Sequence, residues 1–347
     1  MSTRPTEFEY PVLVADIGGT NARFARIDGP NTETVKCPSR GTGNHPGLVE
    51  AIRDSLAEVA GPAPKTLIAA VAGPVTGDTI PLTNAPWVIK PAEVLKELGL
   101  SQVVIINDFE AQALALPGLS GPDIEQIGGG KVRPDSTKFV LGPGTGLGAA
   151  AMIYAAGTWI PVPGEGGHVE IGPVTKEDEA IWPHIERMGG RVGAESILSG
   201  SGLPRLAKAV AASRGTEHRL TTGAAITQAA GENDPVALET LHVFARALGR
   251  VAGDFALSLL ARGGVYLTGG VTPRIDRFLS DGQFRAAFEA KAPHERLVGS
   301  IPTFIVRHPN PALEGLAAFA HEPERFAVDL SGRSWHCAPT QDIERAV

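Results

Sequence analysis

The stretch VLVADIGGTNARFARI, residues 12–27, decides how the fold of this chain is interpreted. Its apolar residues give way at Asp16 to two glycines, Thr20 and Asn21, and then resume, which predicts two strands joined by a glycine turn. A structural hairpin needs the turn but needs neither the carboxylate nor the hydroxyl. Backbone N–H groups and the Thr20 hydroxyl can donate to phosphate oxygens, and Asp16 can hold Mg²⁺ through water. The stretch is therefore either a hairpin with a polar tip or one part of a nucleotide site.

A second glycine turn lies within KFVLGPGTGLGAAAMI, residues 138–153, where an apolar run again breaks and resumes. Two such turns are what a duplicated domain with two phosphate-binding turns contains. Residues 144–149 also fit the G-x-G-x-x-A dinucleotide fingerprint, with Glu165 at the position of its ribose acid. The prolines and glycines of residues 157–167 interrupt the helix and strand that this fingerprint requires, which argues against a nicotinamide enzyme.

Helical and strand patterns alternate along the chain, which indicates an α/β protein. Residues 102–107, QVVIIN, are a short apolar run typical of a buried strand. A long helix is expected from about residue 235 to 262, with Asp234 as its cap and Gly263 at its end. The Pro- and Gly-rich residues 117–135 mark an expected edge between two lobes.

Further polar side chains stand where a ligand could reach them. Asn107 and Asp108 follow the buried strand, and the carboxyl ends of strands are where open α/β sheets bind ligands, although Asp108 is equally a good helix cap. In PGEGGHVEIG, residues 163–172, Glu165 and His168 could bind sugar hydroxyls, or could join Glu170 as metal ligands.

Two motifs are ambiguous when taken alone. Glu195 begins a short helix, where an acid also favours the helix dipole. The strand GVYLTGG ends in Gly269 and Gly270, which would allow the close approach of a flat base or ribose.

The composition excludes several classes of protein. The chain has 347 residues, of which 43% are hydrophobic and 20% charged, and its formal net charge is -7, which argues against a nucleic-acid or anionic-membrane surface. Cys37 and Cys337 cannot form a disulfide framework or a zinc knuckle. We find no signal-peptide pattern and no apolar run long enough to span a membrane, so a cytoplasmic protein is expected.

In this order the motifs resemble the bacterial glucokinase family, within the hexokinase–actin-like ATPase superfamily. The motifs that carry the resemblance span roughly residues 12–321 and are ADIGGTNARFA, INDFEAQALAL, LGPGTGLGAA, VPGEGGHVEIGP, ESILSGSGL, VYLTGGV and PNPALEGLAAF. PGEGGHVE and NDFEAQA are the most specific of them. The second turn, GPGTG, lacks the acid that the wider superfamily carries at its first position. The neighbouring ROK sugar kinases carry a cysteine-rich zinc loop, and this chain has no cysteine between residues 37 and 337.

The resemblance implies an α/β, two-lobed ribonuclease H-like (actin-like ATPase/hexokinase) fold with a duplicated core. The small lobe would comprise residues 8–118 and 309–322, the large lobe 119–308, and a C-terminal tail 323–347. The implied activity is the ATP-dependent phosphorylation of glucose at its 6-hydroxyl, in the cleft between the lobes and with Mg²⁺. A homodimer is expected on the same ground.

The resemblance also implies roles for individual residues in the matching motifs. Asp108 would be the base facing the sugar 6-hydroxyl, ionised at pH 7 without needing a raised pKa. The other implied sugar ligands are Asn107, Glu165, His168 and Glu195. The implied ATP and phosphate ligands are Gly18, Gly19, Thr20, Asn21, Gly144, Thr145 and Gly146, with Gly269 and Gly270 near adenosine and Asp16 organising Mg²⁺.

Two rival functions and two open choices follow from the sequence. One rival is a sugar-sensing regulator that has lost catalysis, although the first strand, near residue 12, is expected to leave no room for an N-terminal DNA-binding domain. The other is the nicotinamide dehydrogenase. The preference for glucose over mannose or fructose stays open, as does the phosphoryl donor, which could be ATP, ADP or polyphosphate.

Overall fold

The computed structural model of the protein describes residues 7–337 apart from Pro74 and Asn84. Residues 338–347 of the expected tail lie outside this range. The chain divides into two compact units, the first formed by the chain up to Gly118, Ala155–Pro161 and the chain from Asn310 onward. The second unit is formed by Leu119–Tyr154 and Val162–Pro309. Among the described residues, no helix is long and apolar enough to cross a membrane.

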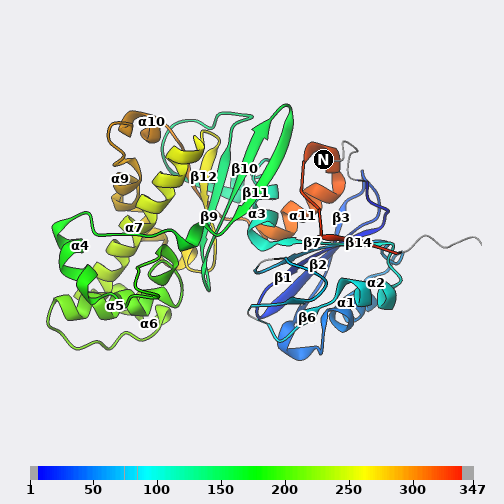
Figure 1. Ribbon diagram of the computed structural model, residues 1–347, viewed down its shortest axis with the longest axis horizontal. Coiled ribbons are helices and arrows are strands. Elements are labelled where there is room, and N and C mark those ends of the chain that lie inside the picture. The colour runs from blue at the N-terminus through cyan, green and yellow to red at the C-terminus, as the bar shows by residue number, and fades with distance from the viewer. Residues whose placement is uncertain (1–6, 74, 84, 338–347) are drawn as a thin grey trace, which may run out of the picture. The chain divides into compact units, whose positions relative to one another are not determined.

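The first unit is built on a six-stranded sheet in the order β14-β7-β4-β1-β2-β3 (Figure 1). Strands β1, β4 and β7 run parallel, whereas β1, β2 and β3 form an antiparallel meander and β14 pairs antiparallel with β7. The strands are β1 (Val12–Ile17), β2 (Asn21–Ile27), β3 (Thr34–Gly41), β4 (Thr66–Val71), β7 (Gln102–Asn107) and β14 (Ser334–His336). A small separate sheet pairs β5 (Ile80–Pro81) with β6 (Val88–Ile89).

Helices cover both faces of this sheet, which explains why its parallel strands are apolar throughout. The alternating residues Leu13, Ala15 and Ile17 of β1 belong to one buried cluster that also includes apolar residues of α1 and α2. Helix α11 packs on β1, β2 and β4 and lies against α3. The helices of the first unit are α1 (Leu48–Ala57), α2 (Pro91–Leu98), α3 (Asp108–Ala115) and α11 (Pro311–His321) with the short turns η1 (Thr42–Asn44) and η7 (Pro323–Arg325).

The second unit repeats this topology. Its sheet has the order β11-β10-β9-β12-β13-β8, in which β9, β12 and β13 are parallel and β9 pairs antiparallel with β10. The first residues of β11, up to residue 161, are grouped with the first unit although the strand belongs to this sheet. Strand β8 pairs antiparallel with β13, just as β14 does with β7. The strands are β8 (Ile124–Gly128), β9 (Lys138–Pro143), β10 (Leu147–Ala155), β11 (Thr158–Gly164), β12 (Gly264–Leu267) and β13 (Thr303–Val306). The expected duplicated core is thereby confirmed, because the same strand order occurs twice.

A large helical layer completes the second unit, with α7 at its centre. Asp234 caps α7 as expected, by accepting from the backbone N–H groups of Val236 and Ala237. The helix ends at Leu259, before the expected Gly263, because Leu260 adopts the left-handed conformation with φ of 46°. The helices are α4 (Lys176–Ile181), α5 (Gly202–Ser213), α6 (Gly223–Gly231), α7 (Pro235–Leu259), α8 (Asp276–Ser280), α9 (Gln283–Glu289) and α10 (Glu295–Gly299). The short turns are η2 (Gly121–Asp123), η3 (Gly166–His168), η4 (Trp182–His184), η5 (Ala194–Ser196) and η6 (Thr272–Arg274).

The segment expected as a separate C-terminal tail is part of the first unit. Its strand β14 extends the sheet next to β7, and Trp335 packs against the buried cluster while its indole N–H donates to Asp78 Oδ1 at 2.7 Å. Arg333 Nη1 donates to Glu110 Oε2 at 2.5 Å, and this carboxylate lies on α3 in the buried interior. The segment therefore docks onto the helix that begins with Asp108.

Candidate active site

The first glycine turn joins β1 to β2 and is held by the chain that follows β3. Gly18 N donates to Asn21 O at 3.0 Å, which closes the turn. Thr42 donates twice, through its hydroxyl to Gly19 O at 2.7 Å and through its backbone N–H to Thr20 O at 3.0 Å. The carbonyls of the turn are therefore bound from one side by the protein, which fixes the turn's conformation.

Asp16 lies one residue before the end of β1, opposite Arg23 of β2 in the strand register. Arg23 Nη1 donates to Asp16 Oδ2 at 3.1 Å. Burial raises the pKa of Asp16, and the Arg23 guanidinium opposes that rise. Arg23 and Thr42 are the residues that sequence reasoning missed. Arg23 could have been found, because a glycine turn at residues 18–20 places it across the hairpin from Asp16.

Asn107 ends β7 and caps α3. Its Oδ1 accepts from Phe109 N at 2.8 Å and from Glu110 N at 3.2 Å, and its Nδ2 donates to Gly73 O at 3.3 Å. The alternative in which Asp108 caps the helix is wrong, because the cap is the residue before it. Asn107 keeps one amide hydrogen beyond these bonds, since an amide nitrogen carries two donors.

Asp108 is the first residue of α3, at the carboxyl ends of the parallel strands β1, β4 and β7. Its Oδ1 accepts from Phe109 N at 3.0 Å. Burial, reinforced by the negative charge of Asp16, raises the pKa of Asp108 to about 6. The expectation of an unraised pKa is therefore wrong, since burial outweighs the favourable helix start. At pH 7 about nine in ten Asp108 carboxyls remain ionised.

The second glycine turn joins β9 to β10 and is tied to Glu195. Gly144 N donates to Gly146 O at 2.8 Å, and Leu147 N donates to Glu195 Oε2 at 2.9 Å. A Cβ on Gly146 would lie 2.4 Å from the same carboxylate oxygen, so glycine is required there. Because a strand follows this turn where the dinucleotide fingerprint demands a helix, the nicotinamide interpretation is wrong.

Glu165 and His168 lie on the loop around η3, which packs against the start of β10. His168 Nε2 is 3.7 Å from Glu165 Oε2, and both side chains are mostly exposed. A Cβ on Gly167 would lie only 1.9 Å from Leu147 O, which shows how closely the loop and the strand approach. The backbone of the η5 segment that bears Glu195 also bonds to this loop, with Ala194 N donating to Val169 O at 2.8 Å. The second unit thus brings the loop, the glycine turn and Glu195 together.

Gly269 and Gly270 follow β12 and lie against the end of β9. Gly269 has a φ of 86°, and a Cβ there would lie 2.5 Å from Pro143 O, so its glycine is required by the backbone. Gly270 and Gly144 differ, because an added Cβ at either one would have no heavy atom within 4 Å. Packing does not require glycine at these two positions, which is consistent with space kept for a ligand.

The predicted site residues therefore fall into two groups. The first unit holds Asp16, Gly18, Gly19, Thr20, Asn21, Asn107 and Asp108, and the second holds Gly144, Thr145, Gly146, Glu165, His168, Glu195, Gly269 and Gly270. Each group combines a glycine turn between antiparallel strands with carboxylates beside it. This arrangement suits a protein that binds phosphates and a polyhydroxylated substrate.

The duplicated topology places the chain among the α/β proteins of the actin-like ATPase and hexokinase fold. A solved glucokinase from an Antarctic psychrotroph has a TM-score of 0.80 with 34% identity and covers 90% of this chain and 99% of its own. A ROK family glucokinase from Streptomyces griseus, solved with glucose and AMPPNP, shares the fold with a TM-score of 0.58 at 21% identity, over 90% of this chain and 99% of its own. The class is thus that of two-unit sugar kinases.

The family model described as Glucokinase matches residues 13–323. A glucokinase from Rhizobium meliloti (strain 1021) is 51% identical over 329 residues, which cover 94% of this chain and 97% of the relative. The chain therefore belongs to the glucokinase family, of the bacterial type outside the ROK branch, and is a kinase that phosphorylates glucose. The predicted resemblance is confirmed.

Proposed function

We propose that the enzyme transfers a phosphoryl group from ATP to the 6-hydroxyl of glucose, with Asp108 as the general base. The observation that carries this proposal is the environment of Asp108, a partly buried carboxylate at the carboxyl end of β7 with a pKa of about 6. A base with this pKa is largely ionised at pH 7 and is a better proton acceptor than a solvated aspartate. Its position is fixed by the Asn107 cap and by α3.

Glucose would be bound mainly by carboxylate and amide groups. Glu165, His168 and Glu195 of the second unit, together with Asn107 of the first, offer acceptors and donors for the other ring hydroxyls. Glu195 is already oriented by Leu147 N, which leaves its second oxygen for a hydroxyl. Polar groups that the bound sugar covers, and that an incorrect epimer leaves unpaired, discriminate strongly, so we propose glucose as the preferred sugar over mannose and fructose.

ATP would be bound at the two glycine turns. Backbone N–H groups of Gly18–Asn21 and Gly144–Gly146 would donate to phosphate oxygens, and Gly269 and Gly270 would lie near adenosine. Support comes from the open space beside Gly144 and Gly270, which lets a ligand approach the backbone closely. The Streptomyces griseus relative was solved with AMPPNP, an analogue of this donor.

The residues of the first unit also suit Mg²⁺. Asp16 and Asp108 offer hard carboxylate oxygens, and Asp16 is close enough to raise the pKa of Asp108. Mg²⁺ is usually held by one or two carboxylates with water and substrate phosphates completing its shell, which fits Asp16 as the organising residue. The bound ion would supply charge neutralisation for the phosphates.

Phosphoryl transfer depends chiefly on positioning and charge stabilisation, because its transition state is loose and anionic. In the proposed step the 6-hydroxyl oxygen of glucose forms a bond to the γ-phosphorus as the bond to the β,γ-bridging oxygen breaks. The hydroxyl proton passes to Asp108, and ADP leaves. Exclusion of water from the bound sugar would prevent hydrolysis of ATP from competing.

The test is the phosphorylation of glucose, mannose and fructose by ATP with Mg²⁺, measured in parallel for the native enzyme and Asp108→Asn. We expect strong turnover on glucose, and a loss of several orders of magnitude in kcat on substitution, with the glucose Kd measured by calorimetry changed only a few-fold. Near-normal turnover of Asp108→Asn would contradict the assignment of the base. Glucose binding without turnover for any sugar with ATP would favour a sensor or another donor, and ADP and polyphosphate are tried next.

We also propose that the enzyme is a homodimer and acts in the cytoplasm. Both proposals rest on the family to which the chain belongs. Light scattering coupled to size-exclusion chromatography measures the first, and cell fractionation the second.

A further inference from the structure

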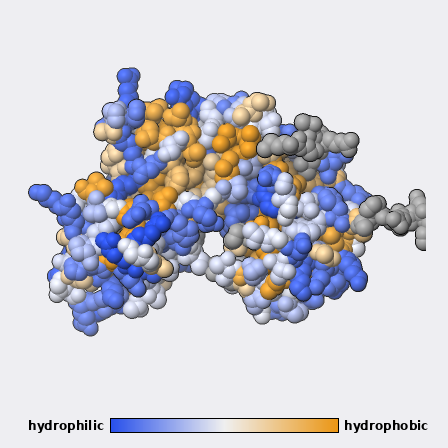
Figure 2. All heavy atoms as spheres, viewed as in Figure 1, coloured by the Kyte–Doolittle hydropathy of each residue, from blue (hydrophilic) through white to orange (hydrophobic). Residues whose placement is uncertain are grey.

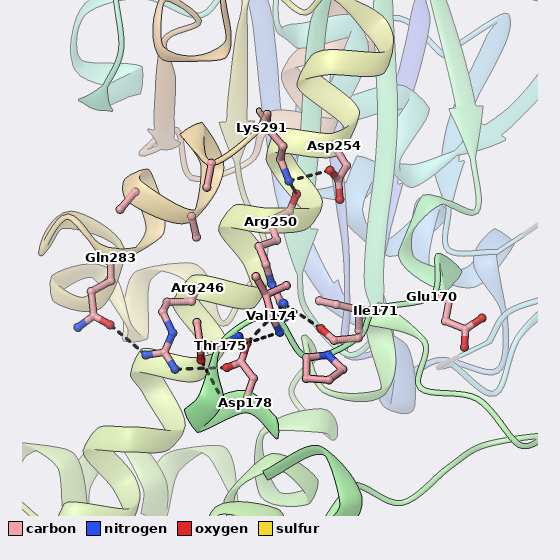
Figure 3. A pocket seen from close by; sticks show the side chains of 15 residues that line it. Glu170, Ile171, Val174, Thr175, Asp178, Arg246, Arg250, Asp254, Gln283 and Lys291 are labelled. Atoms are coloured by element: carbon pink, nitrogen blue, oxygen red, sulfur yellow. Dashed lines mark hydrogen bonds and ion pairs between the residues drawn. The ribbon is translucent and has the colours of Figure 1, made fainter. Parts of the chain in front are cut away.

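The second unit contains a cavity of about 540 Å³ that none of the proposed active-site residues lines. It is bordered by the loop that begins at Glu170, by α4, by α7 and by α9 (Figure 3). Its size falls in the range of small-molecule sites, which is about 300–1,000 Å³. In Figure 2, hydrophobic residues gather over the part of this unit where Figure 1 labels α7 and α9.

One wall of the cavity is apolar. It is formed by small or branched side chains of α9 and of the loop before α4. These residues are Ile171, Pro173, Val174, Ala286, Ala287 and Ala290. Such a wall accommodates the carbon body of a ligand and offers it few hydrogen bonds.

The cavity is also lined by three cations, Arg246, Arg250 and Lys291. Figure 3 shows Asp178 between the two guanidinium groups, but neither pair is close. Arg246 Nη2 is 3.5 Å from Asp178 Oδ1, and Arg250 Nη1 is 3.4 Å from Asp178 Oδ2. A strong pair between a guanidinium and a carboxylate has N–O distances of about 2.7–2.9 Å.

Asp178 cannot neutralise both arginines because its one negative charge faces two positive charges, and it also accepts backbone hydrogen bonds. Its Oδ2 accepts from Val174 N at 3.2 Å and from Thr175 N at 3.4 Å, which completes the capping box of α4. Arg250 is mostly buried, burial lowers its pKa, and its Nε has no partner among the described residues. Two guanidinium groups therefore share one carboxylate beside an open cavity, at distances longer than those of a strong pair. The other acids of the lining, Glu170 and Asp254, are exposed to water.

Lys291 adds to this charge. Its Nζ donates to Arg250 O at 3.0 Å and pairs with Asp254 at 2.7 Å. This pair is close, and water screens it in part because the Asp254 side chain is 68% exposed. An ammonium has three donors, so one remains for a ligand.

We propose that this cavity binds a small organic anion, a carboxylate or phosphate monoester whose apolar body lies on the alanine wall. Arg246 and Lys291 would donate to the anionic group. Arg250, which is mostly buried, would attract the anion through its positive charge. An anion there would relieve the unfavourable burial of the Arg250 charge, which a neutral ligand of the same shape cannot do. The proposal does not depend on the proposed catalytic roles, because no residue is shared.

The test is calorimetric titration of the native enzyme, at constant ionic strength, with phenyl phosphate, benzoate and the neutral benzyl alcohol. We expect at least one anion to bind about tenfold or more tightly than benzyl alcohol, because only the anions pair with the cations. The comparison of phenyl phosphate with benzoate distinguishes a phosphate from a carboxylate site. No binding of either anion, or equal binding of benzyl alcohol, would overturn the proposal.

Two variants test whether the anion binds in this cavity. Arg246→Gln should weaken anion binding about tenfold, and Ala286→Phe should block it by filling the cavity while leaving every charge in place. The matched control is Arg219→Gln, an exposed arginine of the same unit that pairs with Glu217. Retained glucose phosphorylation shows that each variant is folded. Unchanged anion binding in both cavity variants would assign it to another site, such as the glycine turns, and reject the proposal.

Discussion

At the scale of single residues, the decisive group is the Asp108 carboxylate, whose environment opposes its own charge. It begins a helix, which favours an anion, yet burial and the neighbouring Asp16 disfavour the ionised form more strongly. Sites that need a base near neutral pH are built in this way. This environment predicts that replacing Asp108 lowers the rate of catalysis but raises the stability of the fold.

The first prediction concerns pH. As the proposed base, Asp108 must be ionised to accept a proton, so kcat/KM for glucose should fall below about pH 6, tenfold for each further unit of pH. Asp16→Asn removes the negative charge that raises the pKa of Asp108, so the acidic limb should shift to lower pH whatever the loss in absolute rate. The measurement is the pH profile of kcat/KM at fixed free Mg²⁺.

Asp54→Asn is the control for this shift. Asp54 is an exposed acid of the first unit, paired with His45, and it is not among the groups that shift the pKa of Asp108. Its substitution should leave the limb in place. A profile that stays flat down to pH 5, or a limb that Asp16→Asn does not move, would refute the assignment.

The second prediction is that Asp108→Asn, which we expect to be inactive, is more stable than the native protein at pH 7. A pKa raised from 3.8 to about 6 destabilises the folded state by about 3 kcal/mol once the carboxyl is ionised. Asparagine removes this penalty, and the favourable effect of the helix start is already included in the raised pKa. The gain should shrink as pH falls through 6 towards 4, because the folded carboxyl then becomes neutral. Urea unfolding at pH 7 and pH 4 measures it, and a variant less stable at pH 7 contradicts it.

At the scale of elements, the loop around η3 depends on glycine for packing as well as for turning. No residue other than glycine fits at position 167 without a shift of the backbone, because an added Cβ would lie 1.9 Å from Leu147 O. Gly164 starts the same loop, and an added Cβ would meet nothing within 4 Å. The two glycines therefore form a matched pair for substitution.

The third prediction is that Gly167→Ala raises the glucose KM about tenfold or more and destabilises the protein by about 1–3 kcal/mol, because the loop must move away from β10. Gly164→Ala should change neither quantity appreciably. Initial-rate kinetics and urea unfolding measure both. If Gly167→Ala leaves the KM unchanged, the positions of Glu165 and His168 do not depend on the close contact between residue 167 and Leu147 O.

The sequence correctly predicted those elements that depend on residues close together in the chain. The strand at residues 102–107 and the Asp234 cap follow from apolar runs and capping chemistry, and both are found. The end of α7 was misplaced because Leu260, which no composition rule marks, takes the left-handed conformation that glycine usually supplies. The raised pKa of Asp108 was missed because it depends on burial by segments distant in sequence.

At the scale of the whole molecule, an ion pair between residues far apart in sequence joins the last described segment of the chain to the interior of the first unit. Glu110 on α3 is buried, and Arg333, just before β14, donates to both of its oxygens, at 2.5 and 3.3 Å. Burial still raises the pKa of Glu110 despite this partner. No sequence pattern predicted this pair, because neither residue carries a local signal.

The fourth prediction is that Arg333→Ala destabilises the protein by about 3–5 kcal/mol, since it leaves a buried carboxylate without its partner. Adding Glu110→Gln should recover part of the loss, because the remaining side chain is then neutral. Arg325→Ala removes an exposed pair with Glu322 and should cost about 0–1 kcal/mol. Urea unfolding of the native protein, Arg333→Ala, Glu110→Gln, the double variant and Arg325→Ala forms the measurement. An additive double variant would show that the two side chains are not coupled.

The position of β14 has a consequence for aggregation. Strand β7 reads QVVIIN, and Val103, Val104, Ile105 and Ile106 are fully buried. Among the described residues only the short β14 pairs with its outer edge, and an apolar edge without such a cover is a template for pairing with other chains. Proteolytic clipping before Ser334 would therefore do more than shorten the chain, because it would turn a working enzyme into a nucleus for intermolecular β-sheet growth.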